Sequence, residues 1–118
     1  MGTHKFRELT IWRRSREFCT LIYDMTKTFP DNEKFGLTNQ LRRASVSIPS
    51  NIAEGSSRRT NKEFKRFLDY AIGSAYEIET QLMISSDLNF ITNEDCNSLI
   101  SELQEIIKMT SKFKSTLK

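Results

Sequence analysis

The sequence predicts an all-α fold, an antiparallel up-down four-helix bundle, from three observations. The chain of 118 residues holds only four Gly and two Pro, so few residues interrupt helices. Its 37% of hydrophobic and 28% of charged residues are typical of a folded domain and not of a disordered chain. Apolar residues recur in alternating steps of three and four along four segments, which is the spacing of a helix face. A chain of this length buries one core, so we expect residues 1–118 to form a single domain.

The first expected helix spans roughly residues 10–29. Its apolar stripe consists of Ile11, Ser15, Phe18, Ile22, Met25 and Phe29. The segment Phe29-Pro30-Asp31-Asn32 then ends the helix, because proline disfavours helical backbone in the residue before it.

The second expected helix spans roughly residues 36–55. Its stripe consists of Leu37, Leu41, Ala44, Ile48 and Ile52. Pro49 lies inside it, lacks the amide hydrogen and crowds the carbonyl of Ser45, at a cost of about 3 kcal/mol in a helix interior. Since the apolar spacing passes through Pro49 with little change of phase, we predict one helix that is kinked near Pro49.

The third and fourth expected helices span roughly residues 61–88 and 93–117. Thr60 and Glu63 have the spacing of a capping box, and Thr92 starts a second N-cap pattern. The third stripe consists of Phe64, Leu68, Ala71, Ala75, Ile78, Leu82 and Ser85. The fourth consists of Leu99, Leu103, Ile106, Thr110, Phe113 and Leu117. Short connections between four such helices predict antiparallel neighbours.

Two helices carry more apolar surface than a bundle core requires. On the third helix a second strip lies about 80–120° from Phe64, and the first helix shows the same feature. We interpret part of this surface as an oligomer interface made by Trp12, Tyr23, Ile72, Tyr76 and Met83. The alternative is that an imperfect bundle buries wider helix faces.

A polar line follows the flank of the second helix. It consists of Gln40, Ser47, Asn51 and Glu54. Such a line is either a hydrogen-bonded seam between helices or subunits, which we favour, or a solvated face.

Charge is segregated along the chain. Residues 1–66 carry seven more Lys and Arg than Asp and Glu, residues 67–107 carry eight carboxylates and no Lys or Arg, and residues 108–118 carry four lysines. Within the first part, seven cations occur in 25 residues: Arg42, Arg43, Arg58, Arg59, Lys62, Lys65 and Arg66. Arginine donates in a planar fork that suits phosphate oxygens, so this cluster predicts contact with a nucleic-acid backbone. The alternative is a solvated charged face.

Arg13, Arg14 and Arg16 beside Trp12 would extend this basic surface and provide a stacking aromatic. We favour the alternative that Trp12 belongs to the core, as large aromatic residues at helical spacing usually do.

The sequence shows no set of catalytic residues. His4 is the single histidine, and the chain has no glycine-rich phosphate loop, no GxSxG and no Glu-x-x-His repeat. Cys19 and Cys96 lack metal-ligand spacing, so reduced thiols are favoured over a disulfide or a metal site. We therefore expect no enzymatic activity, no metal and no cofactor. No apolar run approaches the roughly 20 residues that span a bilayer and no signal segment opens the chain, so we expect a cytoplasmic protein without membrane contact.

Several stretches of the chain resemble a known family. The most specific is Ile-Pro-Ser-Asn-Ile-Ala-Glu-Gly at residues 48–55, and residues 35–37, 40–44, 64–68 and 71–74 match as well, together with Trp12 and Phe29-Pro30. These residues resemble the bacterial four-helix-bundle proteins encoded in intervening sequences of large-subunit ribosomal RNA genes, often labelled S23 ribosomal protein. The resemblance covers nearly the whole chain.

The resemblance implies a helical bundle that assembles as a homo-oligomeric ring, a homopentamer. It also implies similarity to the basic accessory protein of diversity-generating retroelements, which binds nucleic acid and a polymerase-type partner, a reverse transcriptase. Three of the basic residues lie within or beside the stretches that carry the resemblance: Arg42, Arg43 and Arg58. We therefore predict a non-enzymatic oligomer that binds RNA or DNA phosphates through a basic surface. The alternative is a homo-oligomeric protein-interaction scaffold with no nucleic-acid role.

Overall fold

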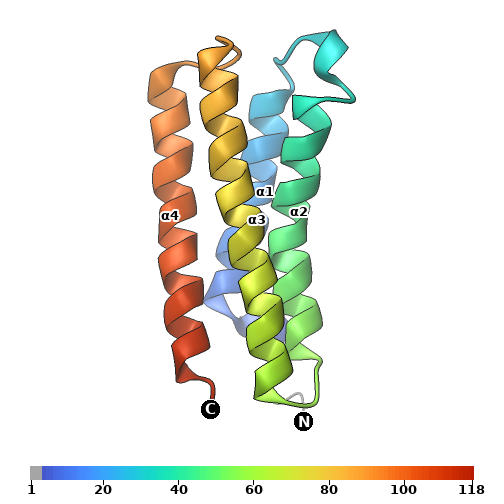
Figure 1. The fold of residues 1–118 in the computed structure, drawn as a ribbon, viewed down its shortest axis with the longest axis vertical. Coiled ribbons are helices and arrows are strands. Elements are labelled where there is room, and N and C mark those ends of the chain that lie inside the picture. Colours follow the sequence, from blue (N-terminus) through green and yellow to red (C-terminus); the bar gives the residue numbers. More distant parts are fainter. Residues whose placement is uncertain (1–3) are drawn as a thin grey trace.

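The computed structural model describes residues 4–118, which form four long helices and no strand in this range. The elements in chain order are η1 (Phe6–Glu8), α1 (Thr10–Thr26), η2 (Asp31–Glu33), α2 (Leu37–Ser56), α3 (Asn61–Asp87) and α4 (Asn93–Thr116), where η marks a 3-10 helix. The four long helices lie side by side with alternating direction in a body of 46 × 24 × 19 Å (Figure 1). The prediction of an all-α four-helix fold is confirmed.

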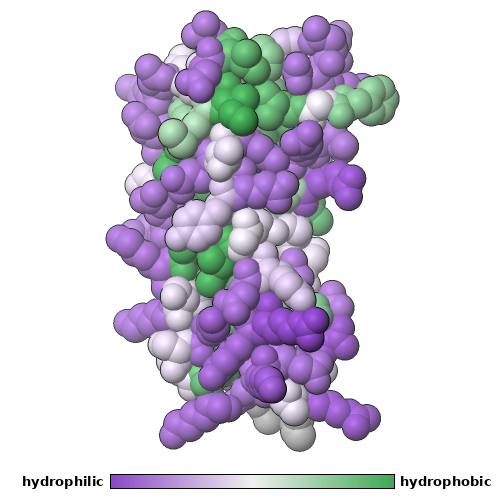
Figure 2. Space-filling model, viewed as in Figure 1, coloured by the Kyte–Doolittle hydropathy of each residue, from purple (hydrophilic) through white to green (hydrophobic). Residues whose placement is uncertain are grey.

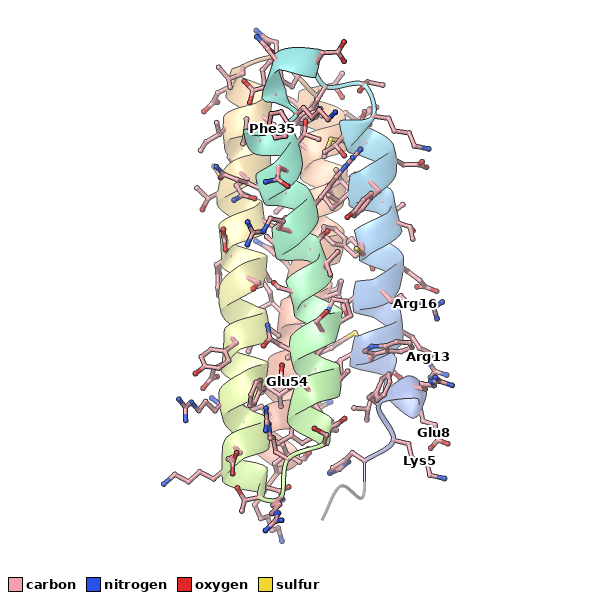
Figure 3. The ribbon with its side chains drawn as sticks, turned by 90° about the vertical axis from the view of Figure 1, so that its right-hand side faces the viewer. Lys5, Glu8, Arg13, Arg16, Phe35 and Glu54 are labelled. Carbon is pink, nitrogen blue, oxygen red and sulfur yellow. The ribbon has the colours of Figure 1, made fainter. Side chains whose placement is uncertain are left out.

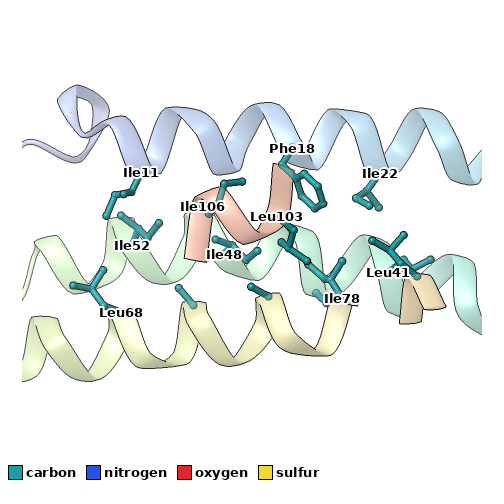
Figure 4. Packing of buried hydrophobic residues seen from close by; sticks show 14 of the residues in the cluster. Ile11, Phe18, Ile22, Leu41, Ile48, Ile52, Leu68, Ile78, Leu103 and Ile106 are labelled. Carbon is teal, nitrogen blue, oxygen red and sulfur yellow. The ribbon is translucent and has the colours of Figure 1, made fainter. Parts of the chain in front are cut away.

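The core consists of the apolar stripes that the helical spacing predicts. Each helix turns one face inward, and isoleucine and leucine side chains from all four helices meet along the axis of the bundle (Figure 4). Every member of the predicted α3 stripe is buried, and Ile22, Leu41, Ile52, Leu68, Ile78, Leu82 and Leu103 have no exposed surface. Full burial of one such side chain contributes about 1.5–3 kcal/mol, so these residues stabilise the bundle.

Helix α1 ends at Thr26, three residues before the predicted end at Phe29. Lys27 closes the last turn through its backbone amide, and Pro30 then precedes the 3-10 helix η2. The N-caps of α3 and α4 lie where the sequence predicts them. The Thr60 hydroxyl accepts a hydrogen bond from the Glu63 amide, and the Thr92 hydroxyl accepts one from the Asp95 amide.

Helix α2 continues through Pro49 as one helix, and a kink at this residue stays a prediction. Two of the four residues in the polar line on its flank, Gln40 and Ser47, form hydrogen bonds with α3. The Ser47 hydroxyl donates to the Ser74 hydroxyl at 2.6 Å, and the Gln81 amide donates to Gln40 at 3.4 Å. Asn51 instead donates to the Ser47 carbonyl of its own helix. The hydrogen-bonded seam is therefore present between helices at Gln40 and Ser47.

None of the helices in residues 4–118 is both long enough and apolar enough to cross a lipid bilayer.

Candidate nucleic-acid interface

The antiparallel topology brings three basic segments to one end of the bundle. The start of α1, the α2–α3 connection and the end of α4 all lie at the lower end in Figure 1. We call residues 4–16, 54–69 and 108–118 the basic end. These segments hold 14 of the 18 Lys and Arg but only four of the 15 Asp and Glu. Strongly hydrophilic side chains project from this end in Figure 2.

Arg58 is held in place at the α2–α3 connection. Its Nη2 donates to Glu54 Oε2 at 2.6 Å, and its guanidinium lies 4.7 Å from the ring centroid of Phe67. Its Nε is buried and makes no hydrogen bond within the described residues. Because Glu54 neutralises its charge, Arg58 contributes less to a phosphate-binding surface than its position in the sequence suggests.

Lys62, Lys65 and Arg66 project from the first turns of α3, where Lys62 and Arg66 are exposed and Lys65 is half-buried. The Arg66 Nε donates to the Tyr70 hydroxyl at 2.9 Å, and this hydrogen bond raises the pKa of the guanidinium above its usual value. The N-terminal end of α3 adds the positive end of a helix dipole at the same place. Arg59 is exposed in the adjoining connection.

Arg42 and Arg43 lie apart from the other five predicted cations. Helix α2 rises 1.5 Å per residue, so Arg43 is about 20 Å from the last residue of the helix. The two side chains also diverge. The Arg42 Nε donates to the Thr26 hydroxyl of α1 at 2.9 Å, whereas Arg43 lines a cavity of about 370 Å³ with Ser74 and Glu77 of α3. The seven predicted cations therefore do not form one continuous patch.

Sequence reasoning missed the C-terminal contribution to the basic end. Lys108, Lys112, Lys114 and Lys118 follow the acidic part of the chain, and the return of α4 brings them to the basic end. Lys114 Nζ reaches Asp69 of α3, with 2.7 Å between nitrogen and oxygen. The signal was available in the sequence, because alternating helix directions place the start of a first helix beside the end of a fourth.

A second basic feature lies beside α1. Arg7, Arg13 and Arg16 line a cavity of about 610 Å³ together with Phe6 and Trp12. Arg13 and Arg16 point away from the bundle in Figure 3. Arg14, by contrast, turns toward α4 and forms an ion pair with Glu102, with 2.8 Å between Nη2 and Oε2. Of the three candidates Arg13, Arg14 and Arg16, only Arg13 and Arg16 therefore extend the basic surface.

The opposite end of the bundle is acidic. Its cavity of about 810 Å³ is lined by Asp24 and Asp95 and by no Lys or Arg among the described residues. Such a surface repels phosphate.

His4 lies at the basic end, where its ring contacts Phe64 and Phe113 edge-on at 5.4 and 5.6 Å between centroids. Within residues 4–118 no group of three or more His, Cys, Asp or Glu is placed to hold a metal ion.

The residues of the expected oligomer interface lie on two flanks. Tyr76 and Met83 are 57% and 54% exposed on the flank of α3 that faces α4, and Ile72 is half-buried there. Tyr23 lies on the flank of α1 that faces α2, where it contacts Arg42, and the spacing of eleven residues, about three helical turns, places Trp12 on the same face of α1. Because α2 and α3 pack together and α1 and α4 pack together, these flanks are on opposite sides of the bundle.

Comparison with known proteins identifies the family. A search of curated proteins finds no match to this sequence. The family model described as 23S rRNA-intervening sequence protein matches residues 7–112, which is most of the chain. The chain belongs to the 23S rRNA-intervening sequence protein family. A crystal structure of a protein with unknown function from the S23 ribosomal protein family of Bacteroides thetaiotaomicron has a similar fold. The TM-score is 0.82 at 26% sequence identity, and the match covers 89% of this chain and 95% of that chain.

The predicted resemblance is thus confirmed. In this member of the 23S rRNA-intervening sequence protein family, the matched segment contains all seven predicted cations and the whole α2–α3 connection. It also contains the arginines that line the cavity beside Trp12.

Proposed function

We propose that this protein is a non-enzymatic, cytoplasmic homo-oligomer that binds RNA or DNA through the phosphates that contact its basic end. The observation that carries the proposal is the concentration of 14 Lys and Arg against four carboxylates in the three segments of that end. A field of this sign raises the local concentration of a polyanion and orients its approach. The exposed side chains at the start of α3 would make the closest phosphate contacts.

Two of the predicted contacts have a different role in this proposal. Arg58 is paired with Glu54 and Arg42 is bonded to Thr26, so both chiefly position other elements. Lys62, Lys65 and Arg66, together with the exposed Lys108, Lys112 and Lys118, carry the electrostatic attraction, whereas Lys114 is paired with Asp69. Their effect would be multiplied in an oligomer, since each subunit repeats the same end.

The placement of the exposed apolar residues supports a ring, and the resemblance implies that this ring is a homopentamer. A patch on the α3–α4 side that meets a different patch on the α1–α2 side makes a head-to-tail contact, and such contacts close into rings when the rotation permits. In such a ring all basic ends would point the same way.

The experiment compares two charge reversals of equal size at opposite ends. Lys62→Glu with Lys65→Glu alters the basic end, and Lys27→Glu with Lys34→Glu alters the acidic end by the same charge. Binding to a fluorescent RNA hairpin and to duplex DNA is followed by anisotropy at about 50 mM salt, where phosphate contacts are strong. We expect the first pair to lose about tenfold or more in affinity and about two units of salt slope, and the second pair to stay within about twofold.

The proposal is wrong if the wild-type protein binds neither probe at that salt concentration, or if both pairs of substitutions reduce the affinity equally.

The second candidate function, a protein-interaction scaffold, is favoured by the opposite placement of the two apolar flanks. It predicts that high salt dissociates the oligomer while nucleic acid leaves its mass unchanged, which light scattering measures. A polymerase-type partner would bind such a scaffold or a nucleic-acid complex of the ring.

A further inference from the structure

The cavity beside Trp12 combines cations with aromatic rings. At the start of α3, Arg58 and Arg66 lie over Phe67 and Tyr70 in a similar way, but Arg58 is paired with Glu54 and Arg66 donates to the Tyr70 hydroxyl. The Arg16 guanidinium lies 5.3 Å from the ring centroid of Trp12, and the Arg7 guanidinium lies 5.9 Å from that of Phe6. The two rings pack edge to face with 5.1 Å between centroids. Each ring therefore carries a planar guanidinium, and η1 and α1 each supply one ring of the pair.

The cations of this cavity retain their donors. Arg7, Arg13 and Arg16 form no ion pair and no side-chain hydrogen bond with any residue in 4–118, in contrast to Arg14, which is bonded to Glu102. Arg7, Arg13 and Arg16 are exposed and Trp12 is half-buried. The cavity volume of about 610 Å³ is in the range of sites that hold small organic ligands, about 300–1,000 Å³.

Phosphate contact alone does not require aromatic rings. A cavity that offers guanidinium planes on aromatic supports, with a further arginine at its edge, suits a planar base flanked by phosphates. Unpaired bases stack on aromatic rings and on arginine planes, whereas bases inside a duplex are not accessible for stacking. No carboxylate of the described residues lines the cavity, so the positive charges of its three arginines favour an anionic ligand.

We infer that the cavity formed by Phe6, Arg7, Trp12, Arg13 and Arg16 binds an unpaired nucleobase of a single-stranded nucleic acid, with Arg13 on the adjoining phosphate. This inference rests on the proposed function and extends it, since it makes single-stranded or locally unpaired nucleic acid the preferred ligand. Trp12 then belongs to the nucleic-acid surface, and the oligomer interface uses the upper part of the α1 flank near Tyr23.

The test uses Trp12 itself, which is the single tryptophan of the chain and therefore the sole source of indole emission. Decathymidylate is added to the full-length protein while emission and anisotropy are recorded. An abasic decamer with the same phosphates but no bases serves as the matched ligand. We expect decathymidylate to quench Trp12 emission and to bind about tenfold or more tightly than the abasic decamer, because stacking is lost with the bases.

Two variants separate the cavity from the rest of the basic end. Arg13→Ala with Arg16→Ala is expected to remove most of the quenching and to reduce the preference for the decamer with bases. Lys62→Glu with Lys65→Glu is expected to weaken binding but to leave the quenching at saturation unchanged. Circular dichroism checks that both variants keep the helical fold.

Three outcomes would overturn the inference. Equal affinity for the two decamers would show that only phosphates are bound, and binding without a change in Trp12 emission would place the bases elsewhere; in both cases the proposed function stands. A change of Trp12 emission that follows protein concentration and mass, and not added decamer, would assign the cavity to a contact between subunits. If no nucleic acid binds at all, the proposed function itself fails.

Discussion

The guanidinium of Arg42 lies 4.7 Å from the ring centroid of Tyr23, across the contact between α2 and α1. The same side chain donates to the Thr26 hydroxyl at 2.9 Å and to the Tyr23 carbonyl at 3.4 Å. Arg42 was expected to contact phosphate and Tyr23 to contact another subunit. The contact between Arg42 and Tyr23 gives both residues a structural role, because it joins the end of α1 to α2.

Arg42→Ala is therefore expected to lower the free energy of unfolding by about 1–2 kcal/mol, through loss of the cation–π contact and the hydrogen bond to Thr26. Arg43→Ala is the matched control. It removes the same charge from an exposed neighbour and is expected to change stability by less than about 0.5 kcal/mol. Urea unfolding followed by circular dichroism measures both. Equal stability of the two variants would show that the Arg42 contacts do not stabilise the bundle.

Gly55 lies at a close contact between α2 and α3. A Cβ atom at this position would lie 2.7 Å from Phe67 Cβ and 2.9 Å from Phe64 Cδ1, which is too close for ordinary contact. We expect Gly55→Ala to destabilise the protein by about 1–3 kcal/mol, because the helices must separate or the phenylalanines must leave their rotamers.

Gly73 provides the opposite case on α3. No atom lies within 4 Å of a Cβ built at this exposed position, so alanine adds no clash. Gly73→Ala is expected to raise the free energy of unfolding by about 0.5–1 kcal/mol, since glycine loses more backbone freedom on folding. Thermal unfolding compares the two variants, and a destabilised Gly73→Ala would mean that the exposed face of α3 packs against another subunit.

Gln81 is buried between α2 and α3 with an unsatisfied oxygen. Its side chain is 6% exposed, its Oε1 has no hydrogen-bond partner within the described residues, and its amide donates over 3.4 Å to Gln40 and 3.3 Å to Glu77. Gln81→Met is expected to be neutral or to stabilise by up to about 1 kcal/mol, because it removes a buried acceptor without a partner. Chemical denaturation tests this, with exposed Gln104→Met as the control. A loss above about 1 kcal/mol would mean that the two long hydrogen bonds outweigh the unpaired oxygen.

The two thiols are expected to react at different rates. Burial, and then the neighbouring carboxylate of Asp87, raises the pKa of the Cys96 thiol, whereas Cys19 is half-buried with its Sγ 3.4 Å from the Ser45 hydroxyl. Since the thiolate is the reactive form, iodoacetamide should modify Cys19 first, and Cys19→Ser should leave only slow modification. Mass spectrometry over time measures which cysteine is modified first. Faster modification of Cys96 would mean that the contact between α3 and α4, which buries this thiol, opens readily.

The sign of the pH effect follows from the raised pKa of Cys96. The unfolded chain releases the thiol proton at a lower pH than the folded protein, so the stabilising contribution is complete below the ordinary thiol pKa. It is lost as the pH rises through the folded pKa. Cys96→Ala should therefore show a smaller loss of stability between neutral and alkaline pH than the wild-type protein, when urea unfolding is measured at each pH.

Much of the fold follows from local pattern. The α3 helix was predicted from residues 61 to 88 and is found from Asn61 to Asp87, because a capping threonine and a regular apolar stripe are properties of neighbouring residues. The end of α1 was less accurate. The stripe continues to Phe29, but the backbone leaves the helix after Thr26, where the turn toward η2 and the packing of Phe29 against Phe90 decide the path.

The candidate site depended more on contacts between distant residues. The sequence alone does not distinguish Arg13, Arg14 and Arg16. In the structure Arg14 pairs with Glu102 of α4, whereas Arg13 and Arg16 are exposed. Likewise Arg42 and Arg43 are adjacent, but helix geometry turns one toward α1 and the other toward α3. Which arginine is available therefore depends on what lies across from it, up to 88 residues away in the chain.

The sequence by itself determined the four helices, their inward faces and the segregation of charge, since each follows from periodicity and composition along the chain. Only the tertiary structure decided that three separate basic segments meet at one end of the bundle. Alternating helix direction brings together residues that the chain keeps far apart, and electrostatic attraction for a polyanion depends on that spatial sum. By contrast, the short turn from η1 to α1 places Phe6 against Trp12, and this local contact forms a cavity from residues that appear in the sequence as an ordinary basic helix start.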